Sequence, residues 1–292
     1  MIRLAFFIAL GIFCDLAAAA VSPQEGYWQQ VLEASSANEI VWLNHDGEKT
    51  LALFADDRTG RPRGAAIIVH TAGKHPDWPE VIAPLRQALP EYGWITLSVQ
   101  MPVLPRTADL AEYAPQLDDV RGRLDSAISL LQTRGIHNIV MIAHGFGNVM
   151  AAHYLAAQAN TPVRAFIGIG MSDFSFIDKR FNLNQLLTAI TMPVLDIYGS
   201  RDSEAVVTAV PLRARAVQQA GLSASRSRQL SAFEGSAAGR SAATKTYGFI
   251  SYRRFEINGA DRDFTGFESM LVKRIAGWLK HHAGGISREV RM

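Results

Sequence analysis

Most of the chain alternates short, almost wholly apolar runs with longer segments whose apolar residues recur every three or four positions. The short runs have the length of strands, and fully apolar strands are typical of a parallel sheet that is covered on both faces. The segment 117–134 is a clear helix, because Val120, Leu124, Ile128 and Leu131 fall on one face. The alternation predicts an α/β fold, with a mostly parallel twisted sheet and helices on both faces. The predicted strands are 65–70, 94–99, 139–143, 163–169, 194–198 and 252–257, and the predicted helices are 78–89, 117–134, 149–158, 206–220 and 267–281.

The N-terminal part departs from this alternation. A helical segment, 27–37, precedes two strand-like runs, 40–43 and 50–54. The Asp-Gly pair between these runs favours the tight turn of an antiparallel hairpin. Near the other end, the stretch 223–246 is rich in Ser, Ala, Gly and Arg, so we expect a loop or a flexible flap there.

The first 20 residues have the pattern of a secretory signal peptide, with Arg3, an apolar run over 4–13 and small residues at 17–20. We therefore expect cleavage near Ala20 and export to the periplasm. The alternatives are an uncleaved membrane anchor and a lipoprotein. The apolar stretch is shorter than the ~20 residues that span a bilayer. A bulky phenylalanine precedes the only cysteine, where a lipoprotein signal requires a small residue.

The remaining length, 21–284, fits a single domain, and the residues 285–292 are expected to form a flexible tail. No later run is long and apolar enough to cross a membrane. With 48% hydrophobic and 19% charged residues, the composition is that of a globular protein. The net charge of +2 is small and the basic residues are scattered, so nucleic-acid binding has no electrostatic support. No metal-binding motif of the H-E-x-x-H type is present, and we expect neither a metal nor a cofactor.

The strand 139–143 runs into the sequence Ala-His-Gly-Phe-Gly, residues 143–147, and then directly into a helix rich in small residues. A strand, a G-x-S-x-G motif and a helix form the nucleophile elbow of α/β hydrolases, whose sharp turn lifts the serine above the sheet. Here the nucleophile position is Gly145, which has no side chain. The two glycines also match the start of a G-x-G-x-x-G fingerprint, but Met150 breaks it, so a dinucleotide site is disfavoured.

The order of the other landmarks resembles that of the α/β-hydrolase superfamily. Residues 70–73, His-Thr-Ala-Gly, follow an early strand and resemble the H-G-G-G loop that supplies an oxyanion-hole amide. Asp202 follows a late strand, where such enzymes have the triad acid. Arg262 follows the last strand and is best aligned with the triad histidine.

The resemblance covers roughly residues 50–281 and becomes more specific in three blocks, 75–79, 93–102 and 194–199. These blocks resemble an uncharacterised bacterial α/β-hydrolase-like family that is known as a domain of unknown function. The resemblance implies the α/β-hydrolase fold, with an N-terminal antiparallel hairpin, but it implies no reaction.

A catalytic triad needs a nucleophile, an imidazole base and a carboxylate that orients the base. Gly145 cannot attack a substrate. Arg262 stays protonated and cannot act as a base. Only Asp202 matches its role, and we expect a structural salt bridge if Asp202 and Arg262 meet. These three residues are therefore degenerate triad positions rather than catalytic residues.

The oxyanion hole can survive this loss, because it is built from backbone amides. By analogy, the amides belong to Phe146 and to Thr71 or Ala72. Gly145 should leave extra room at the elbow, and the helix that follows should point its positive end into the pocket. We expect such a pocket to accept a carbonyl or carboxylate oxygen. The candidate binding residues are Thr71, Ala72, His144, Phe146 and Ser172.

Several other polar residues have two interpretations. His70 and His144 are expected to position the backbone, although either could be a displaced base or a metal ligand. Ser172 is the nearest hydroxyl that could replace the nucleophile, but Ser172 or Asp173 is favoured as a helix N-cap. Asp196 lies inside an apolar strand, so we expect a hydrogen-bonded structural carboxylate, because a buried charge must be paired.

The sequence leaves three functional hypotheses. The first is a non-catalytic exported protein that binds a small apolar or carboxylate-bearing ligand, or a protein partner, through the remnant pocket. The second is a cell-envelope ester or amide hydrolase with a displaced constellation that uses Ser172, His70 or His144. The third is a structural protein, and it differs from the others by predicting a cleft filled by side chains.

Overall fold

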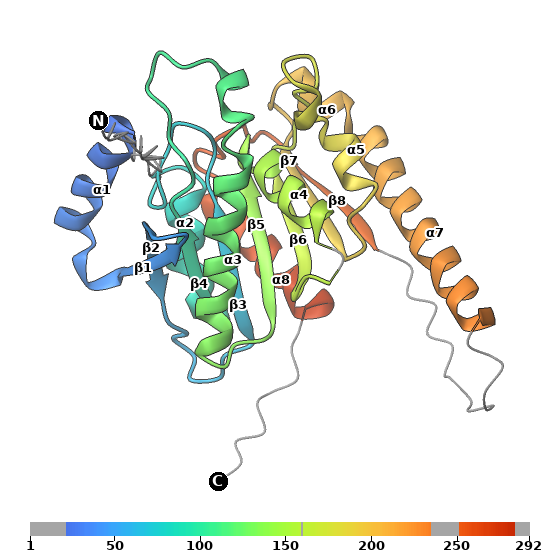
Figure 1. Cartoon of the computed structure of the whole chain (residues 1–292), viewed down its shortest axis with the longest axis horizontal. Helices are drawn as coiled ribbons and strands as arrows, with labels where there is room; N and C mark the ends of the chain where they lie inside the picture. The colour runs from blue at the N-terminus through green and yellow to red at the C-terminus, as the bar shows by residue number, and fades with distance from the viewer. Residues whose placement is uncertain (1–21, 159, 235–250, 284–292) are drawn as a thin grey trace, which may run out of the picture.

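The structure is a computed structural model that describes residues 22–158, 160–234 and 251–283. The predicted signal peptide and the predicted C-terminal tail lie outside these residues. Figure 1 shows one twisted sheet between two layers of helices. The strand order is β1-β2-β4-β3-β5-β6-β7-β8, and the strands from β3 onward run parallel, while β1 and β2 are antiparallel to their neighbours. This is the predicted α/β-hydrolase fold.

The strands agree closely with the predicted ones, because each is short, apolar and bounded by turn residues. The N-terminal hairpin also forms as predicted. Asp46 and Gly47 both have positive φ angles, 47° and 86°, as a tight hairpin turn requires. The strands are β1 (Ile40–His45), β2 (Glu48–Ala55), β3 (Gly64–Val69), β4 (Trp94–Val99), β5 (Ile139–His144), β6 (Val163–Ile169), β7 (Val194–Gly199) and β8 (Tyr252–Ile257).

The helices cover both faces of the sheet. One face packs against α3, α4, α5 and α7, and the other packs against α2 and α8. The short 3-10 turns are η1 (Ala37–Glu39), η2 (Leu89–Tyr92), η3 (Leu110–Tyr113) and η4 (Lys179–Phe181). The helices are α1 (Pro23–Ser35), α2 (Ile82–Ala88), α3 (Leu117–Thr133), α4 (Gly147–Ala157), α5 (Leu183–Leu187), α6 (Glu204–Thr208), α7 (Val210–Glu234) and α8 (Glu268–His282).

Two helices at the N-terminal side differ from their predicted bounds. α1 begins at Pro23, before the predicted 27–37, because the Ser22 hydroxyl accepts a hydrogen bond from the Glu25 amide and caps the helix. α2 is shorter than the predicted 78–89. Val81 has a φ angle of 53°, which a helix cannot contain, so α2 begins only at Ile82.

The predicted loop over 223–246 is wrong in its first half. α7 continues to Glu234, and only the rest of the stretch lies outside the described residues. The reason is that no glycine or proline falls between 222 and 234, while Ala, Arg, Gln and Leu favour a helix. The predicted helix 206–220 is divided between α6 and α7. Pro211 lies at the second position of α7, where the missing amide hydrogen costs nothing.

Candidate functional site

The elbow turn is formed between β5 and α4. Gly145 has a φ angle of 57°, in the left-handed region that favours glycine. Its amide donates to the carbonyl of Ile169 at 3.1 Å, and its carbonyl accepts from the Asn148 amide at 3.1 Å. The buried Asn148 side chain also donates to the carbonyls of Gly145 and Ile169, both at 2.9 Å. The turn therefore has the geometry that would present a nucleophile, although no nucleophile is there.

Thr71 fills the space that the missing side chain would occupy. The Phe146 amide donates a hydrogen bond to the Thr71 hydroxyl at 2.9 Å. A Cβ atom on Gly145 would lie 2.7 Å from the same hydroxyl oxygen, closer than van der Waals contact allows. The expectation of extra room at the elbow is therefore wrong, because the Thr71 side chain of the loop after β3 occupies this space and also binds the Phe146 amide. The side chain of Ala72, the other residue expected at the oxyanion hole, packs against the main hydrophobic core.

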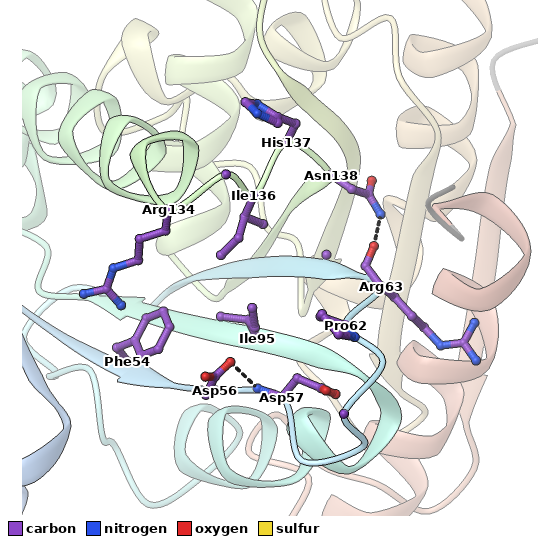
Figure 2. A pocket seen from close by; sticks show the side chains of 13 residues that line it. Phe54, Asp56, Asp57, Pro62, Arg63, Ile95, Arg134, Ile136, His137 and Asn138 are labelled. Carbon is purple, nitrogen blue, oxygen red and sulfur yellow. Dashed lines mark hydrogen bonds between the residues drawn. The ribbon is translucent and has the colours of Figure 1, made fainter. Parts of the chain in front are cut away.

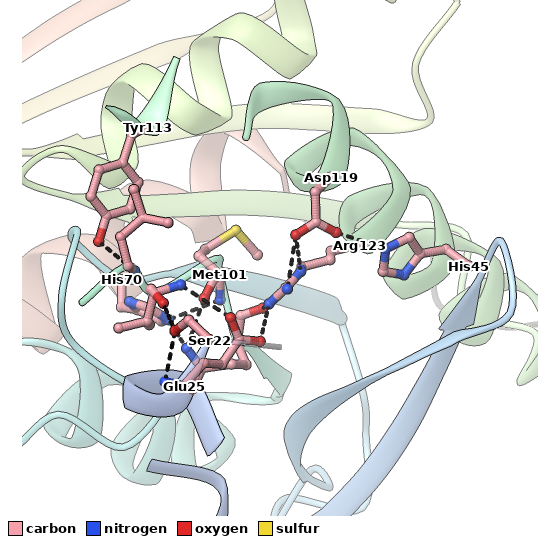
Figure 3. Close-up of polar contacts among 11 residues, drawn as sticks. Ser22, Glu25, His45, His70, Met101, Tyr113, Asp119 and Arg123 are labelled. Carbon is pink, nitrogen blue, oxygen red and sulfur yellow. Dashed lines mark hydrogen bonds and ion pairs between the residues drawn. The ribbon is translucent and has the colours of Figure 1, made fainter. Parts of the chain in front are cut away.

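His70 holds the loop that carries Thr71. It is completely buried, and burial lowers its pKa from 6.5 to about 3, so the imidazole is neutral. Nδ1 donates to the Thr71 carbonyl at 2.8 Å, and Nε2 accepts from the Met101 amide at 2.9 Å. Figure 3 shows His70 beside Met101. With both nitrogens engaged by backbone groups, His70 positions the chain and is not a base.

His144 is also neutral and engaged with the backbone. It is 3% exposed, and burial lowers its pKa to about 4. Its Nε2 donates to the carbonyl of Arg262 at 3.2 Å. This bond connects the end of β5 to the loop after β8 and brings the main chain of Arg262 beside the elbow.

The Arg262 side chain lies over the elbow, at the place expected for a triad histidine. Its Nη2 is 3.5 Å from the position of a Cβ atom on Gly145, and the residue is exposed. The expected salt bridge with Asp202 does not form. Asp202 is only 9% exposed and accepts a hydrogen bond from the Ser203 amide through Oδ1, but its buried Oδ2 has no donor among the described residues. Burial raises the pKa of Asp202, and the nearby Arg262 offsets only part of this effect.

Neither interpretation of Ser172 holds in the structure. Residues 171–174 form no helix, so neither Ser172 nor Asp173 is an N-cap. Asp173 instead closes a turn with the Ser175 amide at 2.7 Å and accepts from Asn184 at 3.0 Å. Ser172 has no hydrogen bond to a histidine, and no serine hydroxyl bonds a histidine anywhere in the part of the chain that the structure describes. A displaced serine and histidine pair therefore has no geometric support.

Asp196 is a structural carboxylate, as the sequence predicts. It is fully buried, and Oδ2 accepts from Arg213 Nε at 2.7 Å and from the Tyr252 hydroxyl at 2.5 Å. Arg213 also donates to the carbonyls of Met171 and Val206, both at 2.9 Å. Sequence reasoning missed Arg213, because a lone arginine in a predicted helix gives no sign that it turns inward.

Aromatic side chains fix the residue after Gly145. The Phe146 ring packs against Tyr113, Phe174 and Phe181, with ring centroids 5.7, 5.4 and 4.9 Å apart. Two residues beyond Phe174, the Phe176 side chain is 82% exposed. The aromatic contacts of Phe146 thus fix the elbow on its buried side, while the apolar side chain of Phe176 is exposed on the loop after β6.

A sizeable cavity lies away from the elbow. It has a volume of about 600 Å³ and opens at the amino ends of β3, β4 and β5. Figure 2 shows an apolar floor that includes Phe54, Ile95 and Ile136, with Asp56 and Asp57 beside it. None of the sequence-predicted site residues lines this cavity. Among residues 22–158, 160–234 and 251–283, no group of His, Cys, Asp and Glu could hold a metal ion, and no helix has the length and apolarity to span a membrane.

Comparison with known proteins identifies the family and the fold of the chain. A family model described as "Protein of unknown function (DUF3530)" matches residues 17–116 and 106–251. A search of curated proteins finds no match. Est1E from Butyrivibrio proteoclasticus has a TM-score of 0.58 at 14% identity, with 84% of this chain and 98% of that chain covered.

Two further solved structures are similar to the same extent. The dienelactone hydrolase from Anabaena variabilis has a TM-score of 0.57 at 16% identity, with 84% of this chain and 97% of that chain covered. An alpha-beta serine hydrolase homologue from Coxiella burnetii has a TM-score of 0.53 at 16% identity, with 83% and 97% covered. At these identities, the likeness establishes the fold alone.

Proposed function

The chain belongs to the DUF3530 family and has the α/β-hydrolase fold, and from this premise we propose that it is an exported protein that lacks serine-hydrolase catalysis and binds a ligand or protein partner at the carboxyl edge of its sheet. One observation carries the proposal. The Thr71 hydroxyl engages the Phe146 amide beside a Gly145 that has no side chain. The nucleophile is therefore absent, and the amide that would stabilise an oxyanion already donates to Thr71.

The residue at the position of the triad base is also incompatible with catalysis. The exposed guanidinium of Arg262 stands where a base is needed, and arginine cannot accept a proton at physiological pH. A guanidinium is suited instead to carboxylate recognition, since its donors match two carboxylate oxygens. The proposed binding function therefore favours a ligand or a protein segment that carries a carboxylate and meets Arg262 above the elbow.

The experiment is to assay the purified protein on short-chain p-nitrophenyl esters and to treat it with a fluorophosphonate probe. We expect turnover equal to that of a Gly145→Trp control and no labelling, because no activated hydroxyl is present. Turnover well above the control, or labelling that a Ser172→Ala change abolishes, would refute the proposal.

Export rests on the first 20 residues, where Arg3, the apolar run and the alanines form a signal pattern. Cell fractionation followed by N-terminal sequencing tests it. We expect a periplasmic protein that begins near Val21. A cytoplasmic protein that retains Met1 would contradict export and would leave the catalytic proposal untouched.

A further inference from the structure

Two side chains of α1 hold the segments around Thr71. Glu25 is 6% exposed, and its carboxylate accepts from Arg123 Nη1 at 2.6 Å and from the Val103 amide at 3.1 Å. Trp28 packs on the His75 ring, with centroids 4.6 Å apart, and His75 belongs to the same loop as Thr71. In Figure 3, dashed lines join Glu25 at the start of α1 to Arg123 of α3.

A continuous set of bonds connects Glu25 to the elbow. Arg123 donates through Nη1 to the Gln100 carbonyl at 2.9 Å, and the next amide, that of Met101, donates to His70 at 2.9 Å. His70 donates to the Thr71 carbonyl at 2.8 Å, and the Thr71 hydroxyl accepts from the elbow amide at 2.9 Å. Although burial opposes it, the combined effect of Glu25 and Asp119 raises the pKa of Arg123, so the guanidinium stays charged and needs its acidic partners.

Besides Glu25, α1 is attached mainly by Trp28, which also packs edge-on against Trp78 with ring centroids 5.9 Å apart, and by Leu32. Leu32 is buried in a small cluster with Leu51 and Leu53, apart from the two main cores. The Ser22 hydroxyl bonds the Val103 carbonyl, while Tyr27 is 53% exposed. A helix that contributes no buried residue to the two main cores, and that is held by one buried ion pair and two apolar side chains, can separate from a fold while the sheet stays intact.

We propose that α1 is a detachable strap that holds Thr71 in the elbow, so that displacement of α1 frees the Phe146 amide and opens the remnant oxyanion site. The inference rests on the proposed function, because it names the regulation of that same site. Its chemistry is a change of hydrogen-bond partners. When the loop 70–78 relaxes, the Thr71 hydroxyl leaves the amide, and that amide becomes available to an oxygen of a ligand.

The test is amide hydrogen exchange in the full protein carrying Glu25→Gln, with Glu33→Gln as the matched control. Glu33 lies on the same helix and is exposed, and among the described residues its side chain bonds only Gln29. We expect Glu25→Gln to speed exchange at the Phe146 amide and in residues 70–78 by about tenfold or more, while α8 stays unchanged. Glu33→Gln should leave all of these rates as they are.

A second variant, Trp28→Leu, keeps the test valid if Glu25→Gln fails to fold. It removes the ring that packs on His75 and leaves the ion pair of Glu25 and Arg123 in place. It should raise exchange in the same two segments. In a Thr71→Val background, where the amide has already lost its partner, Glu25→Gln should cause no further increase at Phe146, since the two changes act along one path. If α1 exchanges faster in these variants while residues 70–78 and Phe146 do not, the strap is refuted. Ester turnover would refute the proposed function instead, so the two failures are distinguishable.

Discussion

Asp202 is the buried polar residue of the site whose bonding is least complete. Oδ1 accepts from the Ser203 amide at 2.7 Å, but no donor among the described residues reaches Oδ2. In a working triad, that oxygen would accept a hydrogen bond from the imidazole of the catalytic histidine. Arg262 lies nearby but forms no ion pair with Asp202. The burial of this carboxylate is therefore only partly compensated, and it lowers the stability of the fold.

We predict that Asp202→Asn stabilises the protein by about 1 kcal/mol at neutral pH, because an amide removes a charge whose burial is only partly compensated. Burial raises the pKa of Asp202 in the folded state above its ordinary value. The wild type therefore has its full stability below the ordinary pKa of an aspartate and loses part of it as the pH rises through the raised pKa. Thermal unfolding at a series of pH values measures this.

The control is Asp263→Asn, which neutralises an exposed carboxylate on the same loop as Arg262. Its effect should be small at every pH. An advantage of Asp202→Asn that is absent at neutral pH, or that shrinks as the pH rises, would show that Asp202 is compensated by interactions other than those described.

At the same scale, the sequence predicted which residue types occupy the triad positions, but not the role of Thr71. Motif spacing placed Gly145 at the nucleophile and Arg262 near the base, since both follow strands at fixed points of the fold. The direction of the Thr71 side chain depends on a loop that is fixed by His70 and by residues far along the chain. One signal was available: a threonine stands where the resembled loop has glycine.

Among the elements, strands were predicted better than helices. Each strand is a closed apolar run, whereas helix bounds depend on caps and backbone angles that composition hides. The positive φ angle of Val81 shortens α2, and an Ala- and Arg-containing stretch that reads as a loop continues α7. α4 shows why a second glycine is needed at the elbow. A Cβ atom on Gly147 would lie 2.6 Å from the His70 carbonyl oxygen, so only glycine lets α4 begin this close to β3.

The elements also divide the site between two sources. β5 and α4 build the turn, and the loop after β3 supplies the side chain that fills it. α1, the segment directly after the expected signal peptide, braces that loop through Glu25 and Trp28. The proposed strap therefore makes the state of the elbow depend on the N-terminal part of the chain as well as on the sheet.

For the whole molecule, the fold could be predicted from the sequence, but the filling of the elbow by the Thr71 side chain could not. The parallel sheet, the hairpin and the order of landmarks follow from apolar periodicity and turn residues. The 600 Å³ cavity at the opposite edge has no sequence signature, because it is lined by residues from separate loops and strands. The similarity to Est1E and to a dienelactone hydrolase describes the fold alone. Chemistry on such a fold depends on single side chains.

The central claim is that Gly145, Thr71 and Arg262 together exclude catalysis, and fluorophosphonate labelling of a restoration series tests it most directly. Gly145→Ser supplies a hydroxyl, Arg262→His a base near Asp202, and Thr71→Gly removes the side chain that would lie 2.7 Å from the new Cβ atom. The new serine also takes a left-handed backbone conformation, at a cost of about 1–3 kcal/mol. Nucleophile and base act as a unit, so single variants should label no faster than wild type.

We predict that labelling rises weakly in the variant with Gly145→Ser and Arg262→His and is fastest when Thr71→Gly is added, because only then is the Phe146 amide available to the oxyanion. Melting curves of every variant confirm that each is folded. Rapid labelling of the wild type, or of Gly145→Ser alone, would mean that a nucleophile or a base is already in place, and it would contradict the account.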